Sequence, residues 1–399
     1  MCKFCHESGE HPDLHLDRTK RLSPQSLEEY ASSLVKNSAT KLQDLHKNET
    51  LVKLVFDKFK LKHGRRYHNS SEEHRRRQIF GQRMAHVLNV NSKNLSHKLG
   101  LNHFSDLTEQ EFNRQKKGLI PDHKKRTRKP RSVFMQYVIH SAKVKSQTKS
   151  KHKSVTKAPP AKGVTASTTL DWVAKGRVTS PTNQLSCGDC YAFATTAVVE
   201  GLLAKKTAKL VSLSPQEITD CSQSYQLQYY GQESGAGGCG GGGFVPSIQY
   251  LNSNGGRQAR WNDYPYVGDQ QGCRASAVSR QTIGANIKYT AVKEGDEAAL
   301  LQAVTRGPVF LAINANTQTF MSYASGVINL SAQDCPNSPY SLDHAVTLVG
   351  YGYDSTTKLN YWKVKNSWST SWGEGGYFRI ARGTKNVCGV ASGAWEGTL

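Results

Sequence analysis

The sequence predicts an α+β protein in which a small helical module precedes a larger, two-part domain. Apolar residues recur at spacings of three and four positions between residues 51 and 112, which is typical of helices. The largely apolar stretch 192–204 predicts a buried helix early in the larger domain. Runs of β-branched and aromatic residues, separated by glycines, follow between residues 308 and 366 and suit a small antiparallel β-barrel. We expect the helical half and the barrel to meet in a cleft.

The positive charge of the chain is concentrated in one short segment. The 399 residues carry a net charge of +22, and residues 114–163 hold 16 lysines and arginines against one acidic residue. Low hydrophobicity with dense like charge predicts an extended, flexible linker. The alternative is contact with polyanions, such as heparin-like polymers or nucleic acid. Aromatic residues are not interleaved with the basic ones in the manner that base stacking needs, which favours the linker.

The first 50 residues give the weakest signals. Cys2, Cys5 and His6 are zinc-ligand types, but their spacing is loose and no second cysteine pair follows. A disordered remnant is therefore favoured over a metal site. The first residues also lack the basic start and apolar core of a signal peptide. No apolar run in the chain approaches the ~20 residues that a membrane span needs.

Cysteine usage points to an oxidising compartment. Seven of the nine cysteines lie between residues 187 and 388, and an odd number suits three disulfides plus one free thiol. Stable disulfides imply a secretory or similar environment. This conflicts with the missing signal peptide, so we expect the natural start to lie upstream of Met1.

Residues 184–193 place an amide side chain, a glycine turn and a thiol ahead of the apolar stretch. We expect a helix to begin near Cys190, with Asp189 capping its first turn. A thiol at a helix N-terminus lies at the positive end of the helix dipole, which favours the nucleophilic thiolate. However, Cys187 and Cys190 could equally be a redox or zinc-binding pair, or two disulfide cysteines. This segment alone leaves the nucleophile undecided.

A cysteine nucleophile also needs a base, and a third group that orients the base. His344 begins an apolar run, and Asn366 ends another in an Asn-Ser-Trp sequence. Each of them, taken singly, is more often structural. Their joint occurrence in the order Cys, His, Asn favours a catalytic set formed by Cys190, His344 and Asn366.

The larger domain, residues 164–399, resembles the papain-like cysteine peptidases. The segments that carry the resemblance are 170–172, 183–193, 213–221, 238–242 and 366–377. It implies the papain-like fold of two subdomains, one helical and one an antiparallel β-barrel, with the cleft between them. It also implies peptide-bond hydrolysis, and the absence of a histidine-rich insertion favours an endopeptidase over a dipeptidase. The alternative is a non-catalytic homologue that binds peptides, but such members typically have a broken Cys-His-Asn set.

Residues 51–113 resemble the inhibitory propeptide of the cathepsin L type within that family. Two motifs carry the resemblance, with Val87 as a conservative match and Arg83 as a mismatch where asparagine is expected; the matching residues are Glu72, Arg76, Phe80, Asn91, Gly100, Asn102, Phe104 and Asp106. The resemblance implies a module that fills the cleft in reverse orientation and keeps the enzyme latent. Activation would then cleave within the basic segment.

The resemblance also implies individual roles. Cys190 would be the nucleophile, His344 the general base and acid, and Asn366 the group that orients the imidazole. Gln184 would stabilise the oxyanion, together with the backbone N–H of Cys190, and Trp368 would shield the imidazole from water. The implied disulfides are Cys187–Cys239, Cys221–Cys273 and Cys335–Cys388.

Substrate preference would be set at the second pocket. The matching positions include no acidic residue, so the pocket should accept bulky apolar side chains; they are Phe244, Ala312, Leu342, Ala345 and Gly393. Gly241 and Gly242 would allow a substrate backbone to approach closely. Three departures surround the thiol, because Leu185, Asp189 and Tyr191 replace the usual glycine, serine and tryptophan. Asp189 adds a like charge beside the thiolate, which should raise the pKa of the thiol.

The expected partners follow from the same resemblance. They are protein and peptide substrates and inhibitors of the cystatin type, and neither a metal nor a cofactor is implied. We expect a monomer, located in the lysosome or outside the cell.

Overall fold

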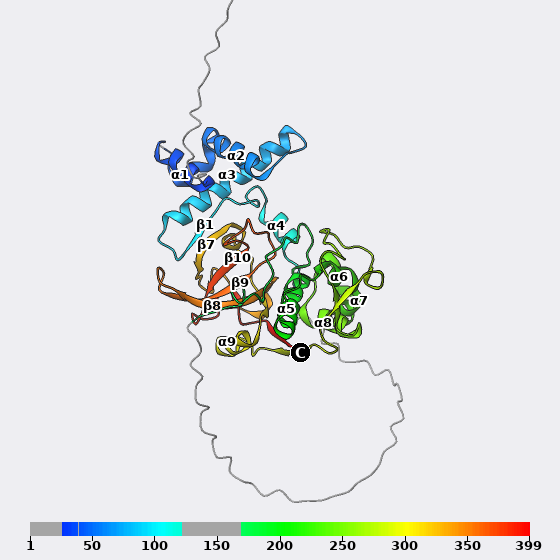
Figure 1. The fold of residues 1–399 in the computed structure, drawn as a ribbon. Coiled ribbons are helices and arrows are strands. Elements are labelled where there is room, and N and C mark those ends of the chain that lie inside the picture. The colour runs from blue at the N-terminus through cyan, green and yellow to red at the C-terminus, as the bar shows by residue number, and fades with distance from the viewer. Residues whose placement is uncertain (1–25, 39, 122–168) are drawn as a thin grey trace, which may run out of the picture.

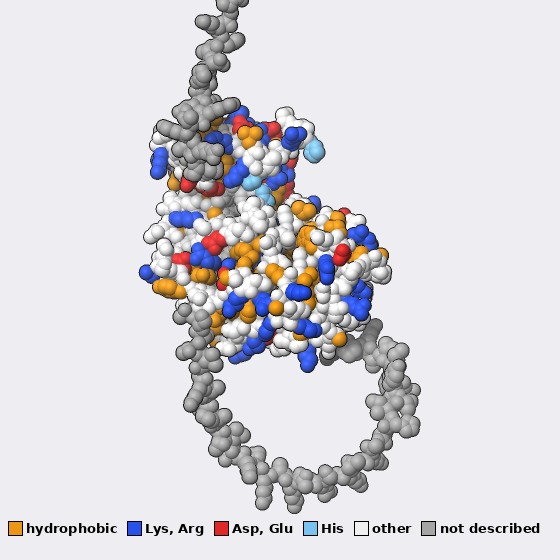
Figure 2. All heavy atoms as spheres, in the orientation of Figure 1, with side chains coloured by type: hydrophobic (Ala, Val, Ile, Leu, Met, Phe, Trp, Pro, Cys, Tyr) orange, Lys and Arg blue, Asp and Glu red, His pale blue; other side chains and the backbone are white. Residues whose placement is uncertain are grey.

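The computed structural model of the protein describes residues 26–38, 40–121 and 169–399 (Figure 1). A helical module lies against a larger domain of helices and strands (Figure 1), and Figure 2 shows the atoms of both parts in the same orientation. The cysteines and histidine at the extreme N-terminus, and most of the basic segment, lie outside the described residues. Within the described ranges, no helix is long and apolar enough to cross a membrane.

Aromatic rings on facing helices form the core of the helical module. The module comprises α1 Leu27–Lys36, η1 Leu42–Lys47, α2 Glu49–His63, α3 Ser70–Ser92 and α4 Glu109–Lys116. Phe56 and Phe59 on α2 contact Phe80 on α3, with ring centroids 5.4 and 4.8 Å apart. All three rings are buried. The predicted helical spacing therefore corresponds to packing between α2 and α3.

The module begins earlier than the predicted residue 51. Ser26 starts α1 with a capping box, since its hydroxyl accepts from the N–H of Glu29 while the Glu29 carboxylate accepts from the N–H of Ser26. Leu27 and Leu45 are buried in the same apolar core as the aromatic rings. Residues 26–50, placed by the sequence analysis in a region of unclear structure, are thus part of the module. The sequence held a signal for α1, because Leu27, Tyr30, Ala31, Leu34 and Val35 recur at helical spacing.

Arg76 joins three parts of the module. It forms an ion pair with Glu72 one turn away on α3 (2.6 Å) and with Glu111 on α4 (2.7 Å). Its guanidinium also donates to the carbonyl of Asp106 at 2.9 Å. A planar guanidinium with several donors can satisfy these acceptors together, which a lysine cannot do.

Asn91 fixes the chain after α3. Its amide donates to the carbonyl of Leu99 (2.8 Å) and accepts from the N–H of Leu99 (2.9 Å). Arg83, the mismatch in the motif, is 6% exposed, and its Nε and Nη1 have no hydrogen-bond partner among the described residues. Burial lowers the pKa of Arg83. Burying donors without partners is costly, and the charge of Glu109 offsets part of the cost of burying the cation.

The module docks by adding a strand to the larger domain. Strand β1 (His97–Leu99) pairs antiparallel with β7 (Tyr323–Ile328). Beyond β1, Asn102 donates from its side-chain amide to the carbonyl of Met321 at 2.9 Å. The module is therefore attached by backbone pairing as well as by side chains.

Helix α5 is the centre of the helical half of the larger domain. The helices of this half, shown in green in Figure 1, are α5 Cys190–Thr207, α6 Pro215–Cys221, α7 Gln223–Tyr230 and α8 Phe244–Ser253. Every residue of α5 from Cys190 to Ala204 is buried. A short hairpin completes this half, with strands β3 Arg257–Ala259 and β4 Arg280–Thr282.

A large sheet forms the other half. In the described residues it has nine strands, in the order β1-β7-β10-β9-β8-β6-β11-β5, with β2 paired to β8. Its strands beyond β1 and β7 are β2 Leu170–Asp171, β5 Lys288–Ala291, β6 Val309–Ile313, β8 His344–Asp354, β9 Leu359–Lys365, β10 Tyr377–Ala381 and β11 Ala394–Thr398. The pairings are antiparallel except that between β7 and β10. Two helices flank the strands, α9 Glu297–Arg306 and α10 Gln318–Ser322.

Three disulfides link loops of the larger domain, and they are Cys187–Cys239, Cys221–Cys273 and Cys335–Cys388. Each closes a loop of 52 or 53 residues. In the chain-entropy picture such a closure stabilises the folded state by roughly 4 kcal/mol. Among the cysteines that the structure describes, Cys190 is the free one.

Truncating the aromatic core should unfold the module selectively. We expect Phe80→Ala to lower the free energy of unfolding by ~3–5 kcal/mol, because it removes a buried ring from two aromatic contacts. Leu61→Ala on α2 is the matched control, since Leu61 is 85% exposed and its truncation should change little. Urea denaturation of the full chain compares the two variants, and equal losses would contradict the assigned core.

Candidate active site

The start of α5 and the start of β8 bring the predicted cysteine and histidine together. Cys190 is the first residue of α5, and its Sγ accepts a hydrogen bond from the N–H of Ala345 at 3.3 Å. Ala345 follows His344 on β8, so the thiol lies against the first residues of this strand. Cys190 and His344 are both fully buried.

Asn366 determines the tautomer of His344. Its Oδ1 lies 2.8 Å from Nε2 of His344 and also accepts from the N–H of Ser367 at 2.8 Å. A backbone N–H can only donate, so this atom is the oxygen, and Nε2 of His344 must carry the proton. The lone pair of the neutral ring is therefore on Nδ1. Within the described residues Nδ1 has no hydrogen-bond partner, as a base for the thiol requires.

Trp368 covers the imidazole. Its ring stacks on that of His344 with centroids 4.6 Å apart, and the indole is buried. Phe104 and Phe112 of the helical module pack edge-on against the same indole, at 6.0 and 5.1 Å. The module thus adds to the apolar cover over the imidazole.

Hydrogen bonds fix the side-chain amide of Gln184 and use one of its two N–H groups. Its Oε1 accepts from the hydroxyl of Ser367 at 2.7 Å, and its Nε2 donates to the carbonyl of Cys187 at 2.8 Å. The backbone N–H of Gln184 also donates to the carbonyl of Ser367 at 2.9 Å. A primary amide has two N–H groups, so the second is available for an anionic oxygen formed next to Cys190.

The chain that follows α4 occupies the cleft. Leu119 forms a parallel bridge with Gly242, in which the N–H of Gly242 donates to the carbonyl of Gly118 (2.8 Å) and the N–H of Ile120 donates to the carbonyl of Gly242 (2.9 Å). The predicted linker began at residue 114, and its first residues therefore belong to α4 and to this cleft segment. The sequence signal was present, because an apolar Leu-Ile-Pro follows Gly118 before the charged run begins.

Gly118 approaches the thiol more closely than any other residue type would allow. A Cβ atom at this position would lie 1.7 Å from the carbonyl oxygen of Gly188. The backbone N–H of Gly118 faces Cys190 and helps to lower the pKa of the thiol. The segment therefore covers the thiol and presents an amide proton to the sulfur.

Burial of the covered site favours uncharged forms of both groups. Burial raises the pKa of the Cys190 thiol to about 12, and the charge of Asp189 adds to this increase. Burial lowers the pKa of His344 to about 3, although the hydrogen bond with Asn366 opposes the decrease. The expected thiolate is thus disfavoured while the cleft is occupied, because desolvation outweighs the helix dipole.

Asp189 does not cap α5, contrary to the prediction. It occupies the N-cap position, but its side chain makes no capping hydrogen bond. One of its carboxyl oxygens lies instead 2.9 Å from the hydroxyl of Thr219 and 2.9 Å from that of Tyr266. Burial raises the pKa of Asp189 to about 7.

Four of the five residues predicted for the second pocket line one cavity of about 140 Å³; they are Phe244, Ala312, Leu342 and Gly393. Ala345 lies against the thiol instead. Ten further lining residues were not predicted; Leu119, Ile120 and Pro121 of the cleft segment are three of them, and Tyr230, Trp395 and Glu294 are three more. Residues two positions apart in a strand share a face, so Trp395 could have been inferred from Gly393. Glu294 is an exposed acidic residue in a lining expected to have none.

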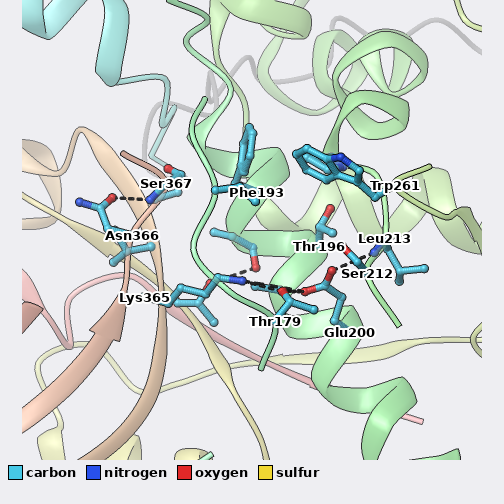
Figure 3. A pocket seen from close by; sticks show the side chains of 17 residues that line it. Thr179, Phe193, Thr196, Glu200, Ser212, Leu213, Trp261, Lys365, Asn366 and Ser367 are labelled. Carbon is cyan, nitrogen blue, oxygen red and sulfur yellow. Dashed lines mark hydrogen bonds and ion pairs between the residues drawn. The ribbon is translucent and has the colours of Figure 1, made fainter. Parts of the chain in front are cut away.

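A small cavity of about 30 Å³ lies between α5 and the strands β8 and β9, next to Asn366 (Figure 3). Glu200 of α5 and Lys365 of β9 face each other across it at 4.0 Å. The hydroxyl of Thr179 joins them, donating to Glu200 (2.6 Å) and accepting from Lys365 (2.8 Å). Because Lys365 is the last residue of β9 and precedes Asn366, this buried contact links the helix of the cysteine to the strand that leads to the asparagine.

Displacing the cleft segment should expose the thiol. We expect Gly118→Ala to increase the alkylation rate of Cys190 by iodoacetamide about tenfold or more in the intact chain, because a Cβ atom cannot fit beside Gly188. Mass spectrometry of the peptide that contains Cys190 measures the rate. Gly272→Ala is the control, since a Cβ atom there meets nothing within 4 Å. An unchanged rate in Gly118→Ala would show that the segment does not protect the thiol.

Comparisons with known proteins agree with this geometry. Residues 166–398 match the family described as "Papain family cysteine protease", and residues 56–112 match the "Cathepsin propeptide inhibitor domain (I29)". Digestive cysteine proteinase 1 of Homarus americanus is 36% identical over 350 residues, covering 86% of this chain and 94% of the relative. Cathepsin L of Sarcophaga peregrina is 35% identical over 348 residues, covering 86% and 91%.

Solved structures of proenzymes have the same fold. The recombinant stem bromelain precursor superposes with a TM-score of 0.68 at 30% identity, covering 87% of this chain and 99% of the other. Digestive procathepsin L 3 of Tenebrio molitor gives a TM-score of 0.65 at 31% identity, covering 88% and 99%. The predicted papain-like fold preceded by a helical module is confirmed. The chain therefore belongs to the papain family of cysteine proteases and is a cysteine endopeptidase of the cathepsin L-like group, made with a propeptide inhibitor domain.

Proposed function

We propose that Cys190, His344, Asn366 and Gln184 carry out the peptide-bond hydrolysis of this protease. The observation that supports this most directly is the Asn366–His344 hydrogen bond, which leaves Nδ1 of the imidazole without a hydrogen-bond partner among the described residues, while the thiol of Cys190 contacts the next residue of β8, Ala345. A non-catalytic homologue is the alternative, but in this chain the complete set is present.

Acylation begins with transfer of the thiol proton to Nδ1 of His344. The thiolate then attacks the substrate carbonyl carbon, and the carbonyl π electrons move to the oxygen. The N–H of Cys190 and the free N–H of Gln184 donate to this oxyanion, each such donor lowering the barrier by roughly 3 kcal/mol. The imidazolium returns its proton to the leaving amine, the C–N bond breaks, and a thioester remains.

Deacylation reverses the roles with water as the nucleophile. His344 removes a proton from a water molecule that attacks the thioester carbonyl, and the C–S bond then breaks. The sulfur leaves as a thiolate and the peptide leaves as a carboxylic acid. Asn366 keeps the ring in one orientation through both steps, and the indole of Trp368 limits the access of water to the imidazole.

The domain organisation follows from the covered cleft. Residues 26–113 act as the inhibitory propeptide, residues 114–121 complete it by filling the cleft, and the peptidase domain comprises residues 164–399. Activation cleaves the chain within the basic segment between them. Three disulfides support an oxidising location, which we place in the lysosome or outside the cell.

The second pocket accepts bulky apolar side chains. Its walls are apolar, and Gly393 leaves its floor open, because a Cβ atom there would lie 2.9 Å from side-chain carbons of Ala312 and Leu342. Glu294 is exposed, so water and salt screen its charge. Leucine or phenylalanine in a substrate is therefore expected to bind better than a basic residue.

Covalent labelling tests the nucleophile. We expect an epoxide inhibitor specific for papain-like thiolates to label the protein after incubation of the precursor at acid pH, giving a labelled band of mature size. Cys190→Ala should lose this label, whereas Ser186→Ala, an exposed residue in the same loop, should keep it. Absence of label on the unmutated, processed protein would refute the assignment of the thiol.

A side chain at position 393 should close the second pocket. We expect Gly393→Leu to lower kcat/KM for a peptide with phenylalanine in this pocket by about tenfold or more, since the loss of one hydrophobic contact costs ~1–3 kcal/mol. The matching alanine peptide is the internal control. If the ratio between the two peptides does not change, the cavity is not the specificity pocket.

A further inference from the structure

Asp189 is a buried acidic group that the hydrolysis mechanism does not use. Its side chain is inaccessible and lies beside the nucleophile in sequence. The hydroxyl of Tyr266 approaches one carboxyl oxygen at 2.9 Å and the other at 3.1 Å, and that of Thr219 approaches at 2.9 Å. Tyr266 also lies 2.8 Å from the backbone carbonyl oxygen of Gln184, the residue that provides the oxyanion donor.

The Tyr266 hydroxyl cannot serve both neighbours alone. It has two oxygen–oxygen contacts of hydrogen-bond length, to Gln184 and to Asp189, but only one proton. The carbonyl of Gln184 has no proton to give. A proton on Asp189 supplies the second donor, because the protonated carboxyl can donate to Tyr266 while Tyr266 donates to Gln184. If Asp189 ionises, it attracts the tyrosine proton, and two lone pairs face each other at the Gln184 contact.

Packing prevents Tyr266 from avoiding this conflict. Its ring meets Phe193 edge-on at 4.8 Å and lies 6.2 Å from Trp261, two of the residues labelled in Figure 3. When Asp189 ionises, the repulsion between the Tyr266 hydroxyl oxygen and the Gln184 carbonyl oxygen must then be relieved. Either the backbone of Gln184 moves, or the distance between these two oxygens increases. Either change displaces the oxyanion donor.

We propose that Asp189 is a positioning residue that works as a protonated carboxylic acid, and that its ionisation switches the mature enzyme off as the pH rises. This rests on the proposed function of Cys190 and Gln184. Ionisation has two effects in the same direction. It loosens the hydrogen-bonded chain that holds Gln184, and it places a negative charge beside a thiolate and a developing oxyanion.

The charges around Asp189 are consistent with this switch. Burial raises its pKa to about 7, against the hydrogen bonds from Thr219 and Tyr266. The other groups that interact with this cluster are Cys190 and Tyr191 of α5, Asp220 of α6 and Lys116 of α4. Lys116 is the cation among them and favours the ionised form of Asp189. It leaves with the propeptide, which removes the one cation among these groups that favours the ionised form.

The protonation state of Asp189 determines the direction in which activity changes with pH. At acid pH the carboxyl holds its proton, because burial raises the pKa of Asp189, and the chain of hydrogen bonds to Gln184 is complete. At higher pH the proton is lost, the thiol pKa rises through the added like charge, and the oxyanion is less stabilised. Activity is therefore expected to fall as the pH rises because Asp189 loses its proton, and not because the thiol or the imidazole changes its protonation state.

The experiment compares pH profiles of kcat/KM for the mature enzyme and its Asp189→Asn variant. Asparagine keeps the shape and can donate to Tyr266 and accept from Thr219, but it cannot ionise. The alkaline limb should move upward by about one pH unit or more in this variant. Asp220→Asn, which changes a neighbouring carboxylate without contact to Gln184, should leave the limb in place. Coincident limbs in Asp189→Asn and the unmutated enzyme would overturn the proposal.

A second measurement does not depend on catalysis or on folding of the variant. Infrared spectra of the unmutated enzyme should show the carbonyl band of a buried protonated carboxyl at acid pH, which disappears as the pH rises past about 7. Tyr266→Phe should shift this band, because it removes the acceptor of the carboxyl proton. Absence of the band refutes the proposal for Asp189. If the band is present but peptides are not hydrolysed and the thiol is not labelled, the proposed function fails instead.

Discussion

The burial of α5 is the constraint on which the rest of the structure depends. From Cys190 to Ala204 every residue of this helix is enclosed, so both halves of the peptidase domain must pack against it. Its first residue therefore has a fixed position relative to β8, where His344 begins. The Glu200–Thr179–Lys365 contact adds a polar tie between the same helix and β9 (Figure 3). The catalytic geometry is thus a consequence of core packing.

Latency arises from the same burial once the cleft is filled. The dipole of α5 favours a thiolate by ~0.3–1 kcal/mol, whereas burial raises the pKa of Cys190 to about 12, which corresponds to roughly 4 kcal/mol in the opposite direction. Desolvation therefore dominates in the proenzyme. Removal of the segment that contains Gly118 readmits water, weakens the desolvation effect on the thiol and the imidazole alike, and lets the dipole and the hydrogen bond from Ala345 favour the charged pair.

Local chemistry made much of the fold predictable, and long-range contacts account for what was missed. The two-part fold and the helical module follow from periodicity and motif spacing, which are properties of neighbouring residues. The packing of residues 26–50, the seating of Gly118 in the cleft and the lining by Glu294 depend on partners distant in the sequence. The supposed cap at Asp189 failed for the same reason, since Thr219 and Tyr266 compete for its carboxylate.

One residue of the propeptide, Lys116, interacts with two of the unusual residues near the nucleophile, Leu185 and Asp189. Leu185 adopts φ 50°, a left-handed conformation that costs a non-glycine residue ~1–2 kcal/mol. Lys116 donates to the carbonyl of Leu185 and also places its charge in the field of Asp189. The proenzyme therefore holds the strained turn and screens the acidic group with a single buried cation. When that cation leaves, the negative charge loses its partner, and uptake of a proton by Asp189 is the compensation that keeps Gln184 in place.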